Sequence, residues 1–156
     1  MSKSTGSCLC GKVTYEVEGG PLNKVHTNTP LLFIPDQLTS YPQALCHCNQ
    51  CQKSSGSAYT TNIVVSNDFF KSTGKTKSYS TKAESGRVVT FVFCPECGSP
   101  LWREGDMAPD AKVVRAGTLD EASVRNDANP LAEVYTENRT EWLKEQVDAK
   151  QFHKMF

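Results

Sequence analysis

The chain has 156 residues, enough for one domain, and 38% of them are apolar, a small share for a large hydrophobic core. Its 17 basic and 17 acidic residues give a formal net charge of zero, which argues against nonspecific binding to nucleic acid. The longest apolar run, LLFI at residues 31–34, is too short to cross a membrane. The polar start, MSKSTGS, does not resemble a secretory signal, so we expect a cytoplasmic or nuclear protein whose thiols stay reduced.

Alternation of apolar and polar residues predicts a mainly β chain. Residues 139–147 are the one expected helix, with Thr140 as N-cap and Trp142 turned inward. We therefore expect a single small domain, residues 1–156, built from antiparallel hairpins. In chain order, the expected strands with their turns are residues 12–18, 58–65, 77–81, 88–94, 111–120 and 131–138.

Residues 27–45 fit this alternation poorly. They contain three prolines, Pro30, Pro35 and Pro42, and show no sustained period. We interpret them as a long loop that leads into the central cysteines, and long ordered loops in compact domains are often functional.

Seven cysteines lie in three short groups, and none lies elsewhere in the sequence. A disulfide framework would leave one thiol over and would be reduced in the cytosol. Cysteines that serve as apolar core residues would be scattered instead of grouped. Metal binding by thiolates accounts for both the odd number and the grouping, so we expect zinc. The groups are Cys8 and Cys10; Cys46, Cys48 and Cys51; and Cys94 and Cys97.

The sequence CPECG is typical of a metal-binding turn, in which Cys94 and Cys97 face one ion and Gly98 takes a positive φ. CLCG offers a second pair, Cys8 and Cys10, because residues i and i+2 of an extended chain share one face. Four thiolates would close a tetrahedral zinc site and tie the first strand to a distant hairpin. Spacing alone leaves open the other pairing, in which the CLC pair joins the central group.

The central stretch CHCNQC supplies three ligands, Cys46, Cys48 and Cys51, and leaves the fourth corner of a tetrahedron to water or substrate. Such an open position is typical of a catalytic zinc. His47 is an alternative fourth ligand, but in an extended chain it points away from its cysteine neighbours. A zinc ion on three thiolates suits another soft ligand, so we expect a substrate thiol, held as thiolate.

The residues that follow, QKSSGSAY, offer hydrogen-bond donors to an anionic, polar substrate. A solvated serine-rich turn explains the same residues equally well. The candidate substrate-binding residues are Lys53, Ser54, Ser55, Gly56 and Ser57.

Four stretches, GSCLCGKVTYEVEG, CHCNQCQKSSGSAY, FCPECGSPLW and AGTLD, together resemble the glutathione-dependent formaldehyde-activating enzyme family, which also includes centromere protein V. The similarity runs from Gly6 to about Trp142 and implies a zinc-stapled β-tent fold of small antiparallel sheets. It implies a structural zinc and a catalytic zinc. Their implied ligands are Cys8, Cys10, Cys94 and Cys97 for the first, and Cys46, Cys48 and Cys51 for the second.

The resemblance further implies a carbon–sulfur lyase that condenses glutathione with formaldehyde to S-(hydroxymethyl)glutathione. The expected partners are a small-molecule thiol and an aldehyde, with no membrane and no nucleic acid. The chain departs from the family pattern in two places. Residues 27–45 are inserted before CHCNQC, and two interpretations stay open, a substrate lid or a retained short intron in the gene. Gln52 stands where the family often has arginine.

Two other functions stay open. One is a non-enzymatic, zinc-stabilised protein-interaction module, and the other is a zinc enzyme of the same fold that acts on another electrophile. An open coordination position favours an enzyme, because a scaffold gains nothing from it.

Overall fold

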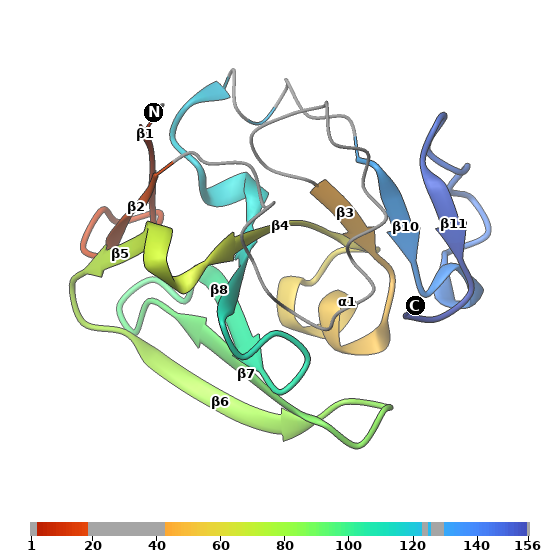
Figure 1. Cartoon of the computed structure of the whole chain (residues 1–156), viewed down its shortest axis with the longest axis horizontal. Helices are drawn as coiled ribbons and strands as arrows, with labels where there is room; N and C mark the ends of the chain where they lie inside the picture. Colours follow the sequence, from red (N-terminus) through yellow and green to blue (C-terminus); the bar gives the residue numbers. More distant parts are fainter. Residues whose placement is uncertain (1–2, 19–42, 123–124, 126–129, 156) are drawn as a thin grey trace.

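The structure, a computed structural model, describes residues 3–18, 43–122, 125 and 130–155. Within these ranges the chain is mainly β, as the alternation predicts (Figure 1). The strands are β1 (Lys3–Ser7), β2 (Thr14–Glu18), β3 (Gln43–Cys46), β4 (Thr60–Ser66), β5 (Phe70–Thr73), β6 (Lys77–Lys82), β7 (Val88–Phe93), β8 (Pro100–Gly105), β9 (Ala111–Arg115), β10 (Ala132–Val134) and β11 (Lys150–Phe152). The helical elements are α1 (Asn49–Ser55) and the 3₁₀ turns η3 (Asn67–Phe69), η4 (Ala116–Thr118) and η5 (Thr136–Asn138).

The strands form two sheets (Figure 1). The smaller is antiparallel, with the order β1-β2-β5, and the larger has the order β11-β10-β3-β4-β9-β8-β7-β6. Hairpins build most of the larger sheet, but β10 runs parallel to both β3 and β11, so this sheet is mixed. Parallel pairs cannot be joined by a tight turn, which is why hairpin spacing in the sequence does not reveal them.

The two faces of the larger sheet carry different side chains, because successive residues of a strand point to opposite sides. Ile63 pairs with Val114 across β4 and β9, and both are fully buried in the main hydrophobic cluster. One residue along, Val64 pairs with Val113, and Val113 pairs with Arg103 of β8. These three residues line a pocket on the other face.

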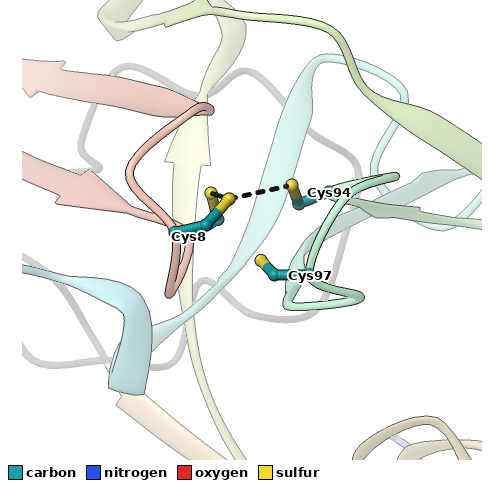
Figure 2. Close-up of side chains that lie close together, drawn as sticks. Cys8, Cys94 and Cys97 are labelled. Carbon is teal, nitrogen blue, oxygen red and sulfur yellow. Dashed lines mark hydrogen bonds between the residues drawn. The ribbon is translucent and has the colours of Figure 1, made fainter.

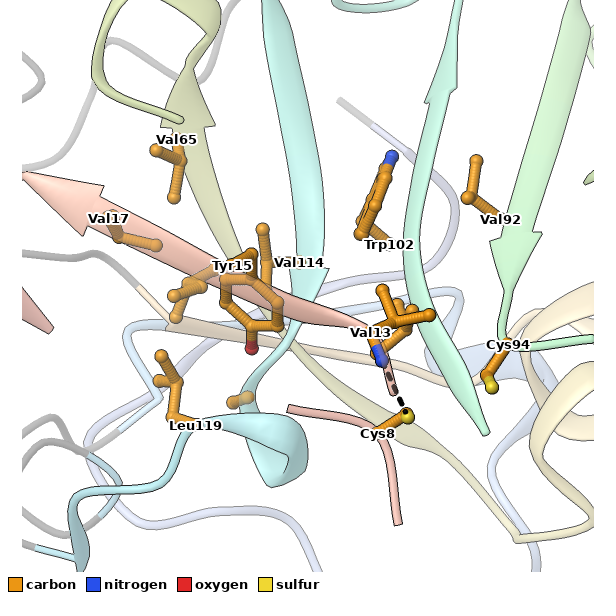
Figure 3. Close-up of a cluster of buried hydrophobic side chains, with 13 residues drawn as sticks. Cys8, Val13, Tyr15, Val17, Val65, Val92, Cys94, Trp102, Val114 and Leu119 are labelled. Atoms are coloured by element: carbon orange, nitrogen blue, oxygen red, sulfur yellow. Dashed lines mark hydrogen bonds between the residues drawn. The ribbon is translucent and has the colours of Figure 1, made fainter. Parts of the chain in front are cut away.

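The main hydrophobic cluster includes side chains of strand β2, among them Tyr15, which is 1% exposed (Figure 3). The Tyr15 ring stacks on Phe70 with centroids 5.5 Å apart, and Phe70 meets Trp102 edge-on at 5.0 Å. Cys8 and Cys94 belong to the same cluster. One cysteine group is therefore attached directly to the core.

The expected helix at residues 139–147 is wrong, because this segment forms bends and isolated turns. The Gln146 N–H donates to a carboxylate oxygen of Glu133 at 3.0 Å instead of continuing a helical turn. Trp142, expected to face inward, is 74% exposed. A short helix without a packed apolar face is only marginally stable in water. Long-range contacts therefore determine the conformation of this segment.

The loop expected at residues 27–45 lies mostly outside the described residues. Its last three residues, 43–45, belong to β3, which pairs with β4 on one side and β10 on the other. The end of the expected loop is thus part of the larger sheet.

Within the described ranges, no helix has both the length and the apolar character needed to cross a membrane.

Candidate metal centres and the adjoining pocket

Four cysteines from two turns meet at the edge of the core. Cys8 and Cys10 lie in the turn between β1 and β2, and Cys94 and Cys97 lie in the turn between β7 and β8. Figure 2 shows the sulfurs of Cys8, Cys94 and Cys97 directed toward a common point. Their Sγ atoms and that of Cys10 all lie within 4.8 Å of one another. This closeness resolves the pairing that spacing left open.

A glycine with a positive φ shapes each of the two turns. Gly98 has a φ of 72°, as the CPECG sequence predicts, and its N–H donates to the Cys94 carbonyl at 2.9 Å. Gly11 has a φ of 73° and its N–H donates to the Cys8 carbonyl, also at 2.9 Å. Glycine adopts this left-handed conformation without steric cost. In both turns a glycine with positive φ follows the second cysteine, and each turn presents a pair of thiols.

The distances in this group fit a tetrahedral metal ion. Four sulfurs each about 2.3 Å from zinc lie about 3.8 Å from one another. Cys8 Sγ lies 3.5 Å from Cys10 Sγ, which lies 3.8 Å from Cys94 Sγ. A hydrogen bond from the Ser99 side chain is the largest cause that lowers the pKa of Cys97, to about 5. The group can thus hold a metal ion with all four positions filled by the chain.

The second group consists of Cys46, Cys48 and Cys51, whose Sγ atoms also lie within 4.8 Å of one another. Cys46 ends β3, and Cys48 and Cys51 lie at the beginning of α1. All three are buried, with exposed fractions of 1%, 7% and 0%. Within the described residues, no fourth Cys, His, Asp or Glu joins this group.

Helix α1 was not expected from the sequence, which was interpreted there as a polar loop. Its N-cap is Cys48, whose sulfur accepts a hydrogen bond from the Cys51 N–H at 3.4 Å. It ends at Gly56, which has a φ of 66° and whose N–H donates to the Gln52 carbonyl. Cysteine is not among the usual N-cap residues, so the sequence pattern did not indicate where this helix begins. Gly56 is a typical helix end and could have indicated the helix.

Two arginines, also missed from the sequence, contact Cys51 from the larger sheet. Arg115, only 5% exposed, donates through Nη1 to Cys51 Sγ at 3.8 Å and to Asn62 Oδ1 at 2.8 Å. Its Nη2 donates to Ser54 Oγ at 3.0 Å. Arg103 Nη1 lies 4.0 Å from Cys51 Sγ, and its Nε is buried without a hydrogen-bond partner. A charged residue inside an apolar strand, as in VVRAG and LWREG, was the available indication.

The guanidiniums of Arg103 and Arg115 form no ion pair with a carboxylate in the described part of the chain. A buried cation without an anionic partner is costly. Hydrogen bonds from the Cys46 and Cys48 thiols, joined by the charges of both arginines, lower the pKa of Cys51. The group is therefore suited to carry negative charge as thiolate, the form that binds metal.

His47 lies between two cysteines of this group in sequence but outside it in space. Its ring is 1% exposed, its Nε2 lies 3.8 Å from a Glu133 carboxylate oxygen, and it contacts the ring of Tyr59 at a centroid distance of 5.6 Å. Glu133 is in turn paired with Arg139. The side chain thus points away from the three sulfurs, as alternation predicts.

A pocket of about 300 Å³ opens beside the three cysteines. Cys46 and Cys48 line it, and so does Arg103. The β6–β7 turn, the β8–β9 turn, the beginning of α1 and Val134 of β10 complete its walls. The sulfur atoms therefore adjoin a space large enough for a small organic molecule.

The five candidate substrate-binding residues, Lys53 to Ser57, are not among the described residues that line this pocket. Ser54 and Ser55 donate their hydroxyls to the Cys51 carbonyl at 3.2 and 2.8 Å, and Gly56 ends α1. These contacts give both serines and the glycine local structural roles. Their part in binding a substrate stays a prediction.

Tyr135 lines the pocket and was not singled out from the sequence. It is 8% exposed, packs with the three cysteines, and holds a left-handed backbone with a φ of 58°. A bulky residue in this conformation is uncommon and is often found at functional sites. Burial, followed by the nearby Cys48 and Cys46 thiolates, raises the pKa of its hydroxyl.

A closed group of four cysteines at the core and an open group of three beside a pocket define a small β protein with two candidate metal centres. A family model described as glutathione-dependent formaldehyde-activating enzyme matches residues 35–138, more than half of the chain, and the protein belongs to this family. The crystal structure of a Rhodobacter sphaeroides protein has a similar fold, with a TM-score of 0.53 and 18% sequence identity. The similarity covers 78% of this chain and 93% of that one. A search of curated proteins gave no match.

Proposed function

We propose that the protein is a zinc-dependent carbon–sulfur lyase that joins a thiol such as glutathione to formaldehyde or another small aldehyde. The observation that carries the proposal is the opening of the three-cysteine group onto a pocket, because Cys46 and Cys48 line that pocket. When bound there, zinc supplies an open coordination position that favours the thiolate form of a substrate.

Arg103 and Arg115 offset the negative charge that collects at this site. Three cysteine thiolates and one substrate thiolate carry four negative charges, against two positive charges on zinc. The two guanidiniums beside Cys51 provide the remaining two positive charges. A neutral total lowers the cost of holding these ions in a buried site.

The reaction forms one carbon–sulfur bond and opens the carbon–oxygen π bond of the aldehyde, and the proton lost from sulfur ends on oxygen. The aldehyde oxygen gains negative charge as the bond forms and needs a hydrogen-bond donor. Tyr135 is the one described pocket-lining residue with a hydroxyl group, and Arg103 lines the same space. We assign Tyr135 as the donor to this oxygen and as the group that passes it a proton.

The test uses protein loaded with two zinc ions, or with cobalt in their place. Glutathione should intensify the sulfur-to-cobalt charge-transfer band, with an affinity that rises with pH as the thiol deprotonates. Added formaldehyde should then be consumed with formation of the thiol adduct. If no small thiol changes the cobalt spectrum, the lyase proposal fails. A non-enzymatic, zinc-stabilised interaction module then becomes the better hypothesis.

The proposal places the protein in a reducing compartment such as the cytoplasm, where its cysteines remain thiols. All seven are free in the structure.

A further inference from the structure

The wall of the pocket beside the three cysteines is mostly apolar. Val64 and Val113 form a cross-strand pair on its floor, and Val88, Val89 and Val134 add three more branched side chains. Burial of an apolar ligand against these valines contributes favourably to the free energy of binding, whereas a polar ligand gains little from them. The polar tripeptide glutathione and formaldehyde, which has only two non-hydrogen atoms, leave this wall unused.

The volume of the pocket is also larger than glutathione-bound formaldehyde alone would require at this position. The pocket holds about 300 Å³, whereas one water molecule in the liquid occupies about 30 Å³. Formaldehyde fills only a small part of such a volume. Because Cys46 and Cys48 line the same pocket as the valines, a group bonded to the substrate sulfur would extend from the metal position toward those valines.

The alternation of the strands links this wall to the chemistry. Val64, Val113 and Arg103 lie side by side on β4, β9 and β8 and share one face. Arg103 also contacts Cys51 Sγ, as Arg115 does. An apolar group on the carbon next to the sulfur would therefore lie against the two valines, with the sulfur end toward the arginine and the cysteines.

We propose that the physiological electrophile is an aldehyde with an apolar alkyl or aryl body, so that the bound adduct carries this body on the carbon next to sulfur. The inference rests on the proposed carbon–sulfur lyase function and narrows its substrate class. The thiol adds to the aldehyde carbon, the carbon–oxygen π bond opens, and the proton from sulfur ends on oxygen, so no oxidant or reductant is needed.

Phenylmethanethiol tests the proposal, because its phenyl group stands on the carbon next to sulfur as in the adduct. With cobalt-loaded protein we expect it to bind at least about tenfold more tightly than 2-mercaptoethanol, measured from the charge-transfer band. Val113→Thr keeps the shape of the side chain but replaces one methyl group with a hydroxyl. It should weaken phenylmethanethiol binding about fivefold without affecting 2-mercaptoethanol. Val64→Thr is the second variant if the first does not fold. Val147→Thr, at a valine that is 72% exposed, is the matched control and should change neither affinity.

Benzyl alcohol has the same apolar body and no thiol, so it tests the wall independently of sulfur binding. Calorimetry should detect its binding to the zinc-loaded protein, and Val113→Thr should weaken that binding. Such binding would support recognition of an apolar ligand by the pocket, whatever the thiols do. If benzyl alcohol binds but neither thiol changes the cobalt spectrum, the result counts against the proposed lyase function and not against the apolar pocket. Equal affinities for the two thiols, or an equal loss of both in Val113→Thr, would overturn the inference while leaving the lyase proposal intact.

Discussion

At the scale of single residues, charge is the feature that separates the two cysteine groups. Arg115 and Arg103 contact Cys51 in the three-cysteine group. Beside the four-cysteine group, Lys12 follows the CLCG turn, is exposed and is paired with Glu96 at 2.9 Å. A buried guanidinium acts on its neighbours through a weakly screened field, whereas an exposed ammonium is screened by solvent.

Arg115→Met should therefore weaken metal binding at the three-cysteine group by about tenfold to a hundredfold, because one compensating charge is lost. Metal retention during competition with a chelator, followed by native mass spectrometry, measures the effect on each ion. Lys12→Gln is the matched control and should leave both ions bound as tightly as before. Equal weakening of both ions in Arg115→Met would show a general loss of fold instead of a local charge effect.

Tyr135→Phe tests the assigned proton donor at the same scale. Removal of the hydroxyl should slow adduct formation about a hundredfold, because the developing charge on the aldehyde oxygen loses its donor. The affinity for the thiol, measured on cobalt-loaded protein, should stay the same. An unchanged rate would exclude Tyr135 as the donor, and a matching fall in thiol affinity would assign it to binding.

At the scale of elements, helix α1 carries two of the three central cysteines and depends on its caps. Gly56 ends it with a φ of 66°, and a Cβ added there would meet nothing within 4 Å. Gly56→Ala should therefore cost about 1 kcal/mol of unfolding free energy from backbone strain alone. Urea denaturation measures this cost.

Gly117→Ala is the matched control for that experiment. A Cβ at Gly117 also meets nothing within 4 Å, but this glycine is not among those with a positive φ. Its substitution should change the stability by a few tenths of a kcal/mol at most. An equal loss in both variants would contradict the role of the left-handed cap.

At the scale of the whole molecule, the four-cysteine group joins the two sheets. Cys8 and Cys10 follow the first strand of the smaller sheet, and Cys94 and Cys97 connect two strands of the larger one. Cys94 is fully buried in the main hydrophobic cluster. Metal binding at a closed site of this kind contributes directly to the free energy of folding.

Cys94→Ser should thus unfold the protein or greatly lower its melting temperature. Cys48→Ser should leave it folded with one metal ion fewer, because the three-cysteine group lies outside the main cluster. Circular dichroism measures the folding of both variants, and metal analysis measures how many ions each one holds. Unfolding of both to the same extent would contradict the division into a structural and a catalytic centre.

The sequence determined the mainly β class and the three short groups of cysteines, because alternation and cysteine spacing are local properties. It indicated the strand at residues 88–94 and the positive φ of Gly98, which the structure confirms. It also predicted a helix at residues 139–147, where Gln146 instead bonds to Glu133, and missed α1, whose N-cap is a cysteine.

Only the tertiary structure decided which cysteines share a site and what surrounds them. Cys8 meets Cys94 because the smaller sheet packs on the larger one, and Arg115 reaches Cys51 because β9 lies beside β4. The pocket exists because Val64, Val113 and Arg103 fall on the same face of three neighbouring strands, of which β4 lies far from β8 and β9 in the chain. Strand register fixes such a face, and register arises from the packing of the whole sheet, which no short stretch of sequence contains.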